Sequence, residues 1–326
     1  MTRSRHSVRF EAIDEAVPGA KWRRRFNETW PFYRDWFCHQ GLDARPDRAT
    51  CLAALRHHLP ELLPIYDALC ELAGGDDTAR RYLSGYNPPP VMPGCSVVVA
   101  PGDRPLLIRN YDFSPSFCEG TILRSRWSGR PVIAMVDGSW GVLDGLNDAG
   151  LAVVLTFGGR PVHGDGFSIL VVMRYLLECC ETTAEAIKVL RRLPVCMSQN
   201  VMLLDRTGDH AVVYLGPDRE AAVDRTPVTT NHQERVEHPE IAAHSRTVER
   251  SDRLHGLHDD PATTRERLID AFAEPPLFQT DYDDWLGTLY TAVYDPIAGE
   301  AEFSWRSETW RQSFGSFDEG LRTIRY

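Results

Sequence analysis

The sequence lacks several features that would assign it to common functional classes. Its eight cysteines form no C-x-x-C pair, so zinc-binding and thiol-redox motifs have no support. Its best apolar run, residues 169–173, stops at Arg174 and is far shorter than the roughly 20 residues of a transmembrane helix. The N-terminus has no apolar segment of a secretory signal. We therefore expect a cytoplasmic protein with reduced thiols, no membrane partner, and no implied metal or organic cofactor.

Positive charge is also scarce, which disfavours nucleic-acid binding. Lysine and arginine number 36 against 46 aspartate and glutamate residues, and the formal net charge is −10. The one basic cluster, residues 21–25, is short and has acidic neighbours at Glu15 and Glu28, as is typical of a solvated helix face. A chain of 326 residues that is 43% hydrophobic predicts a folded protein with one or two domains.

The sharpest change in composition lies at residues 87–93, where three consecutive prolines and Pro93 stiffen the chain. The preceding residues repeat apolar side chains at helical spacing, with Asp47 as the expected N-cap of one helix and a break expected at Pro60. From Cys95 onward the pattern changes to short strands. We therefore divide the chain into a helical leader, residues 1–94, and a catalytic domain, residues 95–326.

Within residues 95–326 the pattern predicts strands, then a helix pair, then further strands. Strands are expected at 96–100, 105–111, 121–126, 131–136, 151–157, 200–205, 210–216, 227–231, 287–294 and 300–305. Helices are expected at 166–180, from 182 onward, at 241–257 and at 263–273, with capping boxes that begin at Thr182 and Thr263. This order favours layered sheets covered by helices over a doubly wound parallel sheet.

The Gly94–Cys95 peptide bond opens the first apolar strand and is a candidate site of self-cleavage. Gly94 presents no side chain to an attacking group, so the thiol of Cys95 can attack the preceding carbonyl. A cysteine freed in this way would hold its nucleophile and its base together, because an α-amine titrates near about 7.7–8. On the next expected strand, Arg109 would favour the thiolate and Asp112 would hold the amine, although a plain surface ion pair has the same pattern.

Four motifs and one arginine occur in an order that resembles a known family. They are Cys95, Arg109-Asn-Tyr-Asp112, Gly145-Leu-Asn147-Asp-Ala-Gly150-Leu, Thr229-Thr-Asn231-His232, and Arg250. Over about residues 95–305 the chain resembles the linear amide C–N hydrolases, which include choloylglycine hydrolases, penicillin V acylases and the acyl-coenzyme A:6-aminopenicillanic-acid acyltransferase-like group, the most similar of the three. All are N-terminal-nucleophile (Ntn) hydrolases. The resemblance implies an α+β fold, a four-layer αββα sandwich, preceded by a helical leader that is cut off as a propeptide.

The resemblance also implies a role for each matching residue. Cys95 would be the nucleophile, freed by cleavage of the Gly94–Cys95 bond, with Arg109 and Asp112 matching the family's charged pair. Asn147 and Asn231 match asparagines that stabilise the oxyanion, and Arg250 would organise the polar network. The implied substrate is a small linear amide or acyl thioester that forms an acyl-enzyme at Cys95. The Thr-Asn-His sequence at 230–232 departs from the Thr-Asn-Asn-Pro common in bile-salt hydrolases and argues against a bile-salt substrate.

Alternatives stay open at several of these positions. Asn147 lies in ordinary turn composition, and Arg246 or Arg253 lies one helical turn from Arg250. His232 with an internal Cys95 would make a papain-type nucleophile that needs no cleavage. A further alternative is a non-cleaving, non-catalytic scaffold of the same fold. The sequence leaves the acyl group, the amine, the choice between hydrolysis and acyl transfer, and the oligomeric state undetermined.

Overall fold

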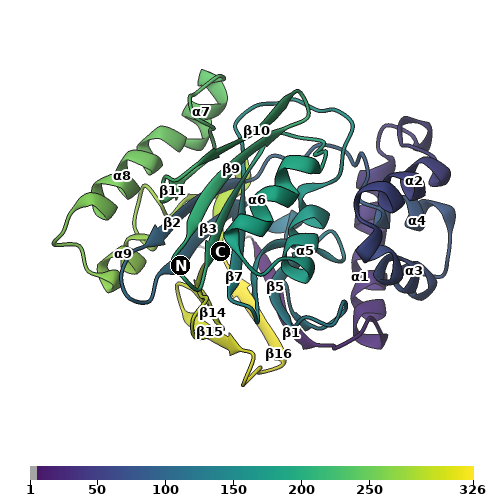
Figure 1. The fold of residues 1–326 in the computed structure, drawn as a ribbon, viewed down its shortest axis with the longest axis horizontal. Helices are drawn as coiled ribbons and strands as arrows, with labels where there is room; N and C mark the ends of the chain where they lie inside the picture. The colour runs from purple at the N-terminus through teal and green to yellow at the C-terminus, as the bar shows by residue number, and fades with distance from the viewer. Residues whose placement is uncertain (1–5) are drawn as a thin grey trace.

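Two β-sheets lie face to face at the centre of the molecule, in a computed structural model that describes residues 6–326 (Figure 1). One sheet has nine strands in the order β10 (Arg219–Asp224), β9 (His210–Gly216), β8 (Gln199–Asp205), β7 (Leu151–Phe157), β6 (Gly141–Asn147), β5 (Val132–Asp137), β4 (Thr121–Ser125), β1 (Ser7–Asp14) and β16 (Gly320–Arg325). The other has seven: β11 (Val228–Thr229), β2 (Gly94–Ala100), β3 (Leu106–Phe113), β13 (Leu286–Asp295), β14 (Glu300–Trp305), β15 (Glu308–Ser313), and β12 (Thr280–Asp281) beside β13. Strand β2 contacts β7 across the interface between the sheets.

Helices cover the outer face of each sheet. Helices α5 (Ile169–Cys179) and α6 (Thr183–Arg192) pack on the nine-stranded sheet. On the other side α7 (Pro239–Ser245), α8 (Thr247–Asp259) and α9 (Arg265–Ala271) follow one another, and α8 packs on β2 and β11. Every residue of β2 is buried, as expected for a strand covered on both faces. The layers are helix, sheet, sheet and helix, so the predicted αββα sandwich is confirmed.

The leader packs against one end of this sandwich (Figure 1). It contains α1 (Ala20–Cys38), α2 (Arg48–His58), α3 (Leu63–Leu72) and α4 (Asp77–Leu83). The prediction of a wholly helical leader is wrong for residues 7–14, which form β1. Strand β1 pairs in antiparallel with β16 and in parallel with β4. Val8, Phe10 and Ala12 are buried at alternate positions, a period-2 pattern that the helical interpretation overlooked.

Local signals in the sequence located most of the other helix ends. The side chain of Asp47 caps α2 and that of Thr182 caps α6, as predicted, and the break at Pro60 separates α2 from α3. Helix α9 begins after Thr264 rather than Thr263. The helix expected at 241–257 is two helices, because Arg246 adopts a left-handed conformation with φ of 52°. Strands β6, β10, β15 and β16 were not predicted.

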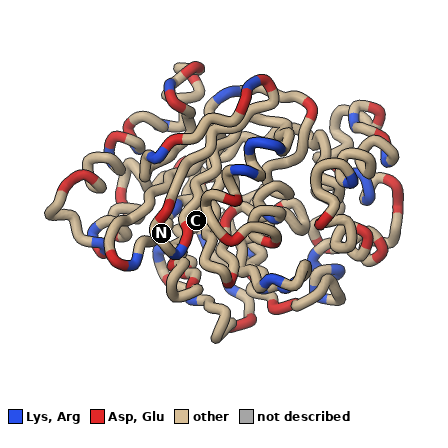
Figure 2. The backbone as a smooth tube through the Cα atoms, viewed as in Figure 1, with Lys and Arg blue, Asp and Glu red and all other residues tan. Residues whose placement is uncertain are grey.

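Charged residues lie mainly on the outer helices and loops, where both signs alternate, whereas the central strands carry few (Figure 2). The exceptions are informative. Arg109, Asp112, Asp144 and Arg250 are all fully buried between the layers. Burying a charge is costly unless it is paired and hydrogen-bonded, so this cluster marks a site rather than ordinary packing. Within residues 6–326, no helix is long and apolar enough to cross a membrane.

Candidate active site

Cys95 is the second residue of β2 and lies fully buried between the two sheets. In the antiparallel pair β2–β3, Cys95 lies opposite Tyr111 and Val97 lies opposite Arg109. Side chains two residues apart on a strand share a face, so Cys95 and Arg109 are diagonal neighbours. The Nη2 atom of Arg109 donates a hydrogen bond of 2.9 Å to Sγ of Cys95. The structure therefore brings together the first two residues that the sequence selected.

The protonation state of this thiol is set by two opposing effects. Burial raises the pKa of the Cys95 thiol to about 11, although the positive charge and hydrogen bond of Arg109 act to lower it. The negative charge of Asp112 also raises it, and that of Arg250 lowers it. In the uncleaved chain the thiol is therefore protonated at neutral pH.

Arg109 is held in place by a carboxylate that the sequence analysis missed. Its Nη1 atom donates to Oδ2 of Asp144 and, at 3.2 Å, to the carbonyl oxygen of Leu143. Asp144 in turn accepts hydrogen bonds from the hydroxyls of Tyr290, at 2.6 Å, and Tyr294. Asp144 comes from β6, which was not predicted. The one signal available was an aspartate within an apolar stretch, directly before the motif that begins at Gly145.

The backbone of Cys95 is bound by two further predicted residues. Its N–H donates a 2.9 Å hydrogen bond to Oδ1 of Asn231. Arg250, on α8, donates from Nη2 to the same Asn231 oxygen at 2.6 Å and from Nη1 to the carbonyl oxygen of Cys95. It also donates to Oγ of Ser96 at 2.8 Å. Its neighbours Arg246 and Arg253 instead form ion pairs with Glu249 and Glu274 on the surface, so Arg250 is the arginine of this site.

Asp112 lies directly beside this network but does not contact the Cys95 nitrogen. Its Oδ1 accepts from Oγ1 of Thr288 at 2.6 Å, and its Oδ2 accepts from Nε2 of Gln279 at 2.9 Å and faces Arg250 at 3.5 Å. Burial raises the pKa of the Asp112 carboxyl, while Arg250 and the two hydrogen bonds act to lower it. In the uncleaved chain Asn231 therefore occupies the position in which Asp112 was expected to hold the Cys95 nitrogen.

Asn147 and His232, which the sequence analysis considered for the site, make their hydrogen bonds to residues other than Cys95. Asn147 donates from Nδ2 to the carbonyls of Leu177 and Cys180, and its Oδ1 accepts from the N–H of Leu151. It joins the β6–β7 turn to the end of α5, so the expected oxyanion role is not supported and the turn interpretation fits. The Nδ1 atom of His232 bonds to the hydroxyls of Thr247, at 2.9 Å, and Thr230, at 3.3 Å, rather than to the thiol.

Gly94 is required here by space rather than by an unusual backbone conformation. It lies opposite Asp112 in the strand pair. A Cβ atom at this position would lie 3.1 Å from both Cβ of Asp112 and Cδ2 of Leu286, closer than most such contacts. Any larger residue would have to displace Asp112 or Leu286, or shift the Gly94–Cys95 peptide bond.

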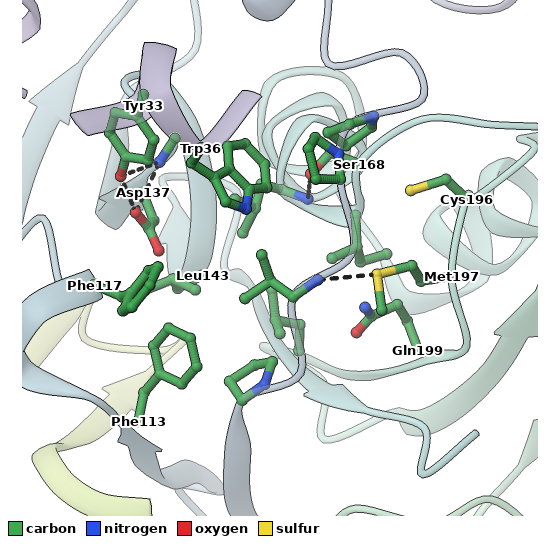
Figure 3. A pocket seen from close by; sticks show the side chains of 18 of the residues that line it. Tyr33, Trp36, Phe113, Phe117, Asp137, Leu143, Ser168, Cys196, Met197 and Gln199 are labelled. Atoms are coloured by element: carbon green, nitrogen blue, oxygen red, sulfur yellow. Dashed lines mark hydrogen bonds between the residues drawn. The ribbon is translucent and has the colours of Figure 1, made fainter. Parts of the chain in front are cut away.

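Two cavities flank the proline-rich linker, and Pro93 lines both of them. The first is an apolar pocket with about 750 Å³ of empty space, part of it open to solvent (Figure 3). Its walls combine α1, the linker, β3 and α5, and they include Tyr111, the neighbour of Cys95, and Leu143, the neighbour of Asp144. The second is an open groove lined by Phe157, Asn231, Ile241 and Trp285, among others. The linker thus separates the two cavities, and Pro93, two residues before Cys95, lies between them.

The αββα sandwich, with a buried cysteine at the start of an inner strand, places the chain in the class of Ntn-hydrolase folds. Sequence comparison then gives the family. The chain belongs to the acyl-coenzyme A:6-aminopenicillanic acid acyl-transferase family, whose pattern matches residues 99–310. The predicted resemblance is confirmed, and it identifies an amidase or acyltransferase of the Ntn type. The matched region includes Arg109, Asp112, Asn231 and Arg250 and begins after Cys95.

The chain is also similar to solved structures at low sequence identity. Penicillin V acylase from Agrobacterium tumefaciens is 14% identical, with a TM-score of 0.50 over 71% of this chain and 91% of that one. A conjugated bile acid hydrolase variant from Clostridium perfringens (14% identity, TM-score 0.42, 71% and 97% covered) is also similar. The Caenorhabditis elegans orthologue of N-acylethanolamine-hydrolyzing acid amidase is similar as well, with 14% identity and a TM-score of 0.46 over 62% of this chain and 93% of that one. No functionally curated protein matches.

Proposed function

We propose that this protein is a self-processing cysteine amidohydrolase or acyltransferase, in which Cys95 becomes the N-terminal residue of the active chain. The observation that carries the proposal is the pair of contacts made by Cys95: its sulfur with Arg109 and its backbone nitrogen with Asn231. The atoms that would become nucleophile and base are thus each held by a separate polar group. Family membership supports the reaction class.

Maturation would proceed by an N-to-S acyl shift. The Cys95 thiol attacks the carbonyl carbon of Gly94, the C–N bond breaks, and the leader is held as a thioester while the Cys95 nitrogen becomes a free amine. Water then hydrolyses the thioester, which releases the carboxylate of Gly94 and restores the thiol. Asn231 already contacts this nitrogen, and Arg250 contacts the Cys95 carbonyl. The new ammonium would gain a nearby counter-charge in Asp112.

Turnover would reuse the same groups. The α-amine of Cys95 takes the thiol proton, and the sulfur attacks the acyl carbon of a linear amide or acyl thioester. The amine or thiol of the substrate leaves with that proton, and water or a second amine removes the acyl group from the sulfur. Asn231 would contribute a side-chain N–H to the tetrahedral oxyanion once Pro93, whose carbonyl it faces at 3.5 Å, has moved.

The two cavities suggest how a substrate would lie. Departure of residues 88–93 from the first pocket would join it to the groove past Cys95. The enclosed apolar pocket suits the acyl group, and the open groove suits the amine. A groove wide enough for an amine nucleophile would permit acyl transfer as well as hydrolysis, depending on how well water is excluded.

Intact mass and N-terminal sequencing of purified protein test this proposal. We expect a new N-terminus at Cys95 in the native protein and an uncleaved chain in Cys95→Ala. Hydrolysis of N-acyl amino acids, penicillins or acyl-coenzyme A donors should appear only in the cleaved form. An uncleaved native chain whose hydrolysis depends on Cys95 would overturn the proposal in favour of an internal nucleophile, although His232 does not contact the sulfur. An uncleaved and inert chain would indicate a scaffold.

A further inference from the structure

The apolar pocket contains one carboxyl group whose second oxygen faces the cavity. Asp137, at the end of β5, accepts hydrogen bonds at Oδ1 from the N–H of Gly138, at 2.8 Å, and from the hydroxyl of Tyr33 on α1. Its Oδ2 accepts no hydrogen bond from residues 6–326, and in Figure 3 it points into the space beside Phe117 and Leu143. A strong acceptor is therefore left open in a cavity that is mainly apolar.

No cation compensates this carboxyl group. Among the described residues, no lysine, arginine or histidine contributes a compensating charge at Asp137. A second carboxyl, Glu119, lies beside the same tyrosine and accepts from the Tyr33 hydroxyl at 3.1 Å. Burial and the charge of Glu119 raise the pKa of Asp137 to about 7. An unpaired acceptor in an apolar wall is unfavourable unless a ligand supplies a donor.

A second polar group in the pocket is also unpartnered. Gln199 is 4% exposed, and its Oε1 atom has no hydrogen-bond partner within the described chain. It lies on the wall opposite Asp137, beside Met197 and the linker (Figure 3). A pocket made only for a hydrocarbon chain would leave both acceptors unsatisfied. Their presence favours a ligand that carries polar hydrogens.

The position of Asp137 relative to the sulfur decides which part of the substrate it meets. Leu143 accepts from Arg109, which contacts the thiol, and Gly141, two residues earlier on β6, is paired with Asp137. Two residues of strand span roughly 7 Å. Asp137 therefore lies beyond the reacting carbon, on the side of the pocket formed by the leader.

We propose that Asp137 is a specificity residue, and that the preferred acyl groups are apolar chains or rings that end in a hydrogen-bond donor, a hydroxyl or an ammonium. This inference rests on the proposed function and adds the substrate class. In its ionised form, which a bound donor would stabilise, Asp137 accepts the terminal hydrogen at Oδ2, and the aromatic walls contact the carbon skeleton. Tyr33 completes this end of the pocket, so the leader contributes to substrate selection after cleavage.

The test uses matched p-nitroanilides of hexanoic, octanoic and decanoic acids and their ω-hydroxy and ω-amino derivatives. With the cleaved native protein, kcat/KM for at least one donor-ended series should exceed that of the plain alkyl chain by roughly tenfold or more. The comparison between the hydroxy and amino series shows whether the site takes a neutral or a cationic donor. Equal kcat/KM for alkyl and both donor-ended chains of every length would overturn the inference.

Variants separate Asp137 from general effects on the pocket. Asp137→Asn keeps an acceptor for Tyr33 and Gly138 but can present a donor to the cavity, so the preference for donor-ended chains should disappear. The matched control is Glu119→Gln, which changes a carboxyl beside the same tyrosine but outside the cavity lining and should keep the preference. A preference that survives Asp137→Asn contradicts the inference. If instead no chain is hydrolysed by cleaved native protein, the proposed function fails rather than the choice of acyl group.

Discussion

The Nη2 atom of Arg109 donates to Sγ of Cys95 at 2.9 Å, yet the thiol remains protonated in the uncleaved chain. The reason is that the linker and both sheets exclude water from Cys95, and burial outweighs the favourable charge of Arg109. Removal of the linker would admit water to the sulfur and add an amine on the same residue. Under the proposed function, the chain would be a precursor whose thiol gains reactivity when the leader is cut.

Loss of Arg109 should block maturation, and a paired variant can separate this effect from instability. Arg109→Gln alone leaves Asp144 as a buried unpaired carboxylate, which typically destabilises a fold by about 3–5 kcal/mol. The double variant Arg109→Gln/Asp144→Asn removes both charges and should recover most of that stability. We expect it to fold, as judged by thermal unfolding, but to cleave at least roughly a hundredfold more slowly in a time course by intact mass. Native-like cleavage in the double variant would show that Arg109 acts only as a structural partner of Asp144.

The cut leader should remain bound to the catalytic chain. Strand β1 lies between β4 and β16 and pairs with both, so its loss would open two edges within the nine-stranded sheet. Phe10 and Phe26 are also buried in the shared core. After cleavage we expect both fragments to elute together in size-exclusion chromatography and to separate only in denaturant. A catalytic chain that elutes alone, still folded and active, would contradict this.

The sequence predicted those parts of the site that depend on short-range geometry. Cys95 and Arg109 lie on adjacent strands of one hairpin, so strand periodicity alone places their side chains on one face. Asn231 and Arg250 lie far along the chain, and only the family resemblance connected them to Cys95.

The unpredicted parts depend on contacts between distant elements. Asp144, Thr288 and Gln279 come from β6, from β13 and from the loop before it, and no local pattern indicates that they meet Arg109 or Asp112. Asn147 shows the opposite case, because a motif match predicted an oxyanion role, whereas its side chain hydrogen-bonds within the β6–β7 turn and to the end of α5. The strand β1 carried a clear alternating pattern, but it lay within a leader that was interpreted as helical throughout.

Asn147 and Asn231 should therefore behave differently when each is changed to alanine. Asn147→Ala removes two hydrogen bonds from the β6–β7 turn to the end of α5 and one within the turn, which should lower the free energy of unfolding by about 1–3 kcal/mol. Its cleavage rate, measured well below the unfolding temperature, should stay near native. Asn231→Ala removes the acceptor of the Cys95 N–H and a partner of Arg250, so cleavage should slow by about a hundredfold or more. A large loss of cleavage in folded Asn147→Ala would restore its predicted catalytic role.

Asp137 should make the stability of the uncleaved protein fall as the pH rises. Its pKa is raised from 3.8 to about 7 in the folded chain by burial and by Glu119, so the folded state holds its proton more tightly than the unfolded state. The corresponding stabilisation is fully present below about pH 4 and is lost as the pH rises through about 7, by at most roughly 4 kcal/mol. Denaturant unfolding of Cys95→Ala, which should stay a single chain, measures this slope without interference from cleavage.

The matched variant is Cys95→Ala/Asp137→Asn. An asparagine has no proton to lose in this range, so the decline of unfolding free energy between about pH 4 and pH 7 should become much shallower. At pH 8 this variant should be more stable than Cys95→Ala, because it avoids a second negative charge beside Glu119. If both proteins lose stability in parallel over this range, other groups that gain protons on folding, such as Asp112, dominate the pH dependence. In that case Asp137 would already be ionised at neutral pH, and Tyr33 would donate to a carboxylate.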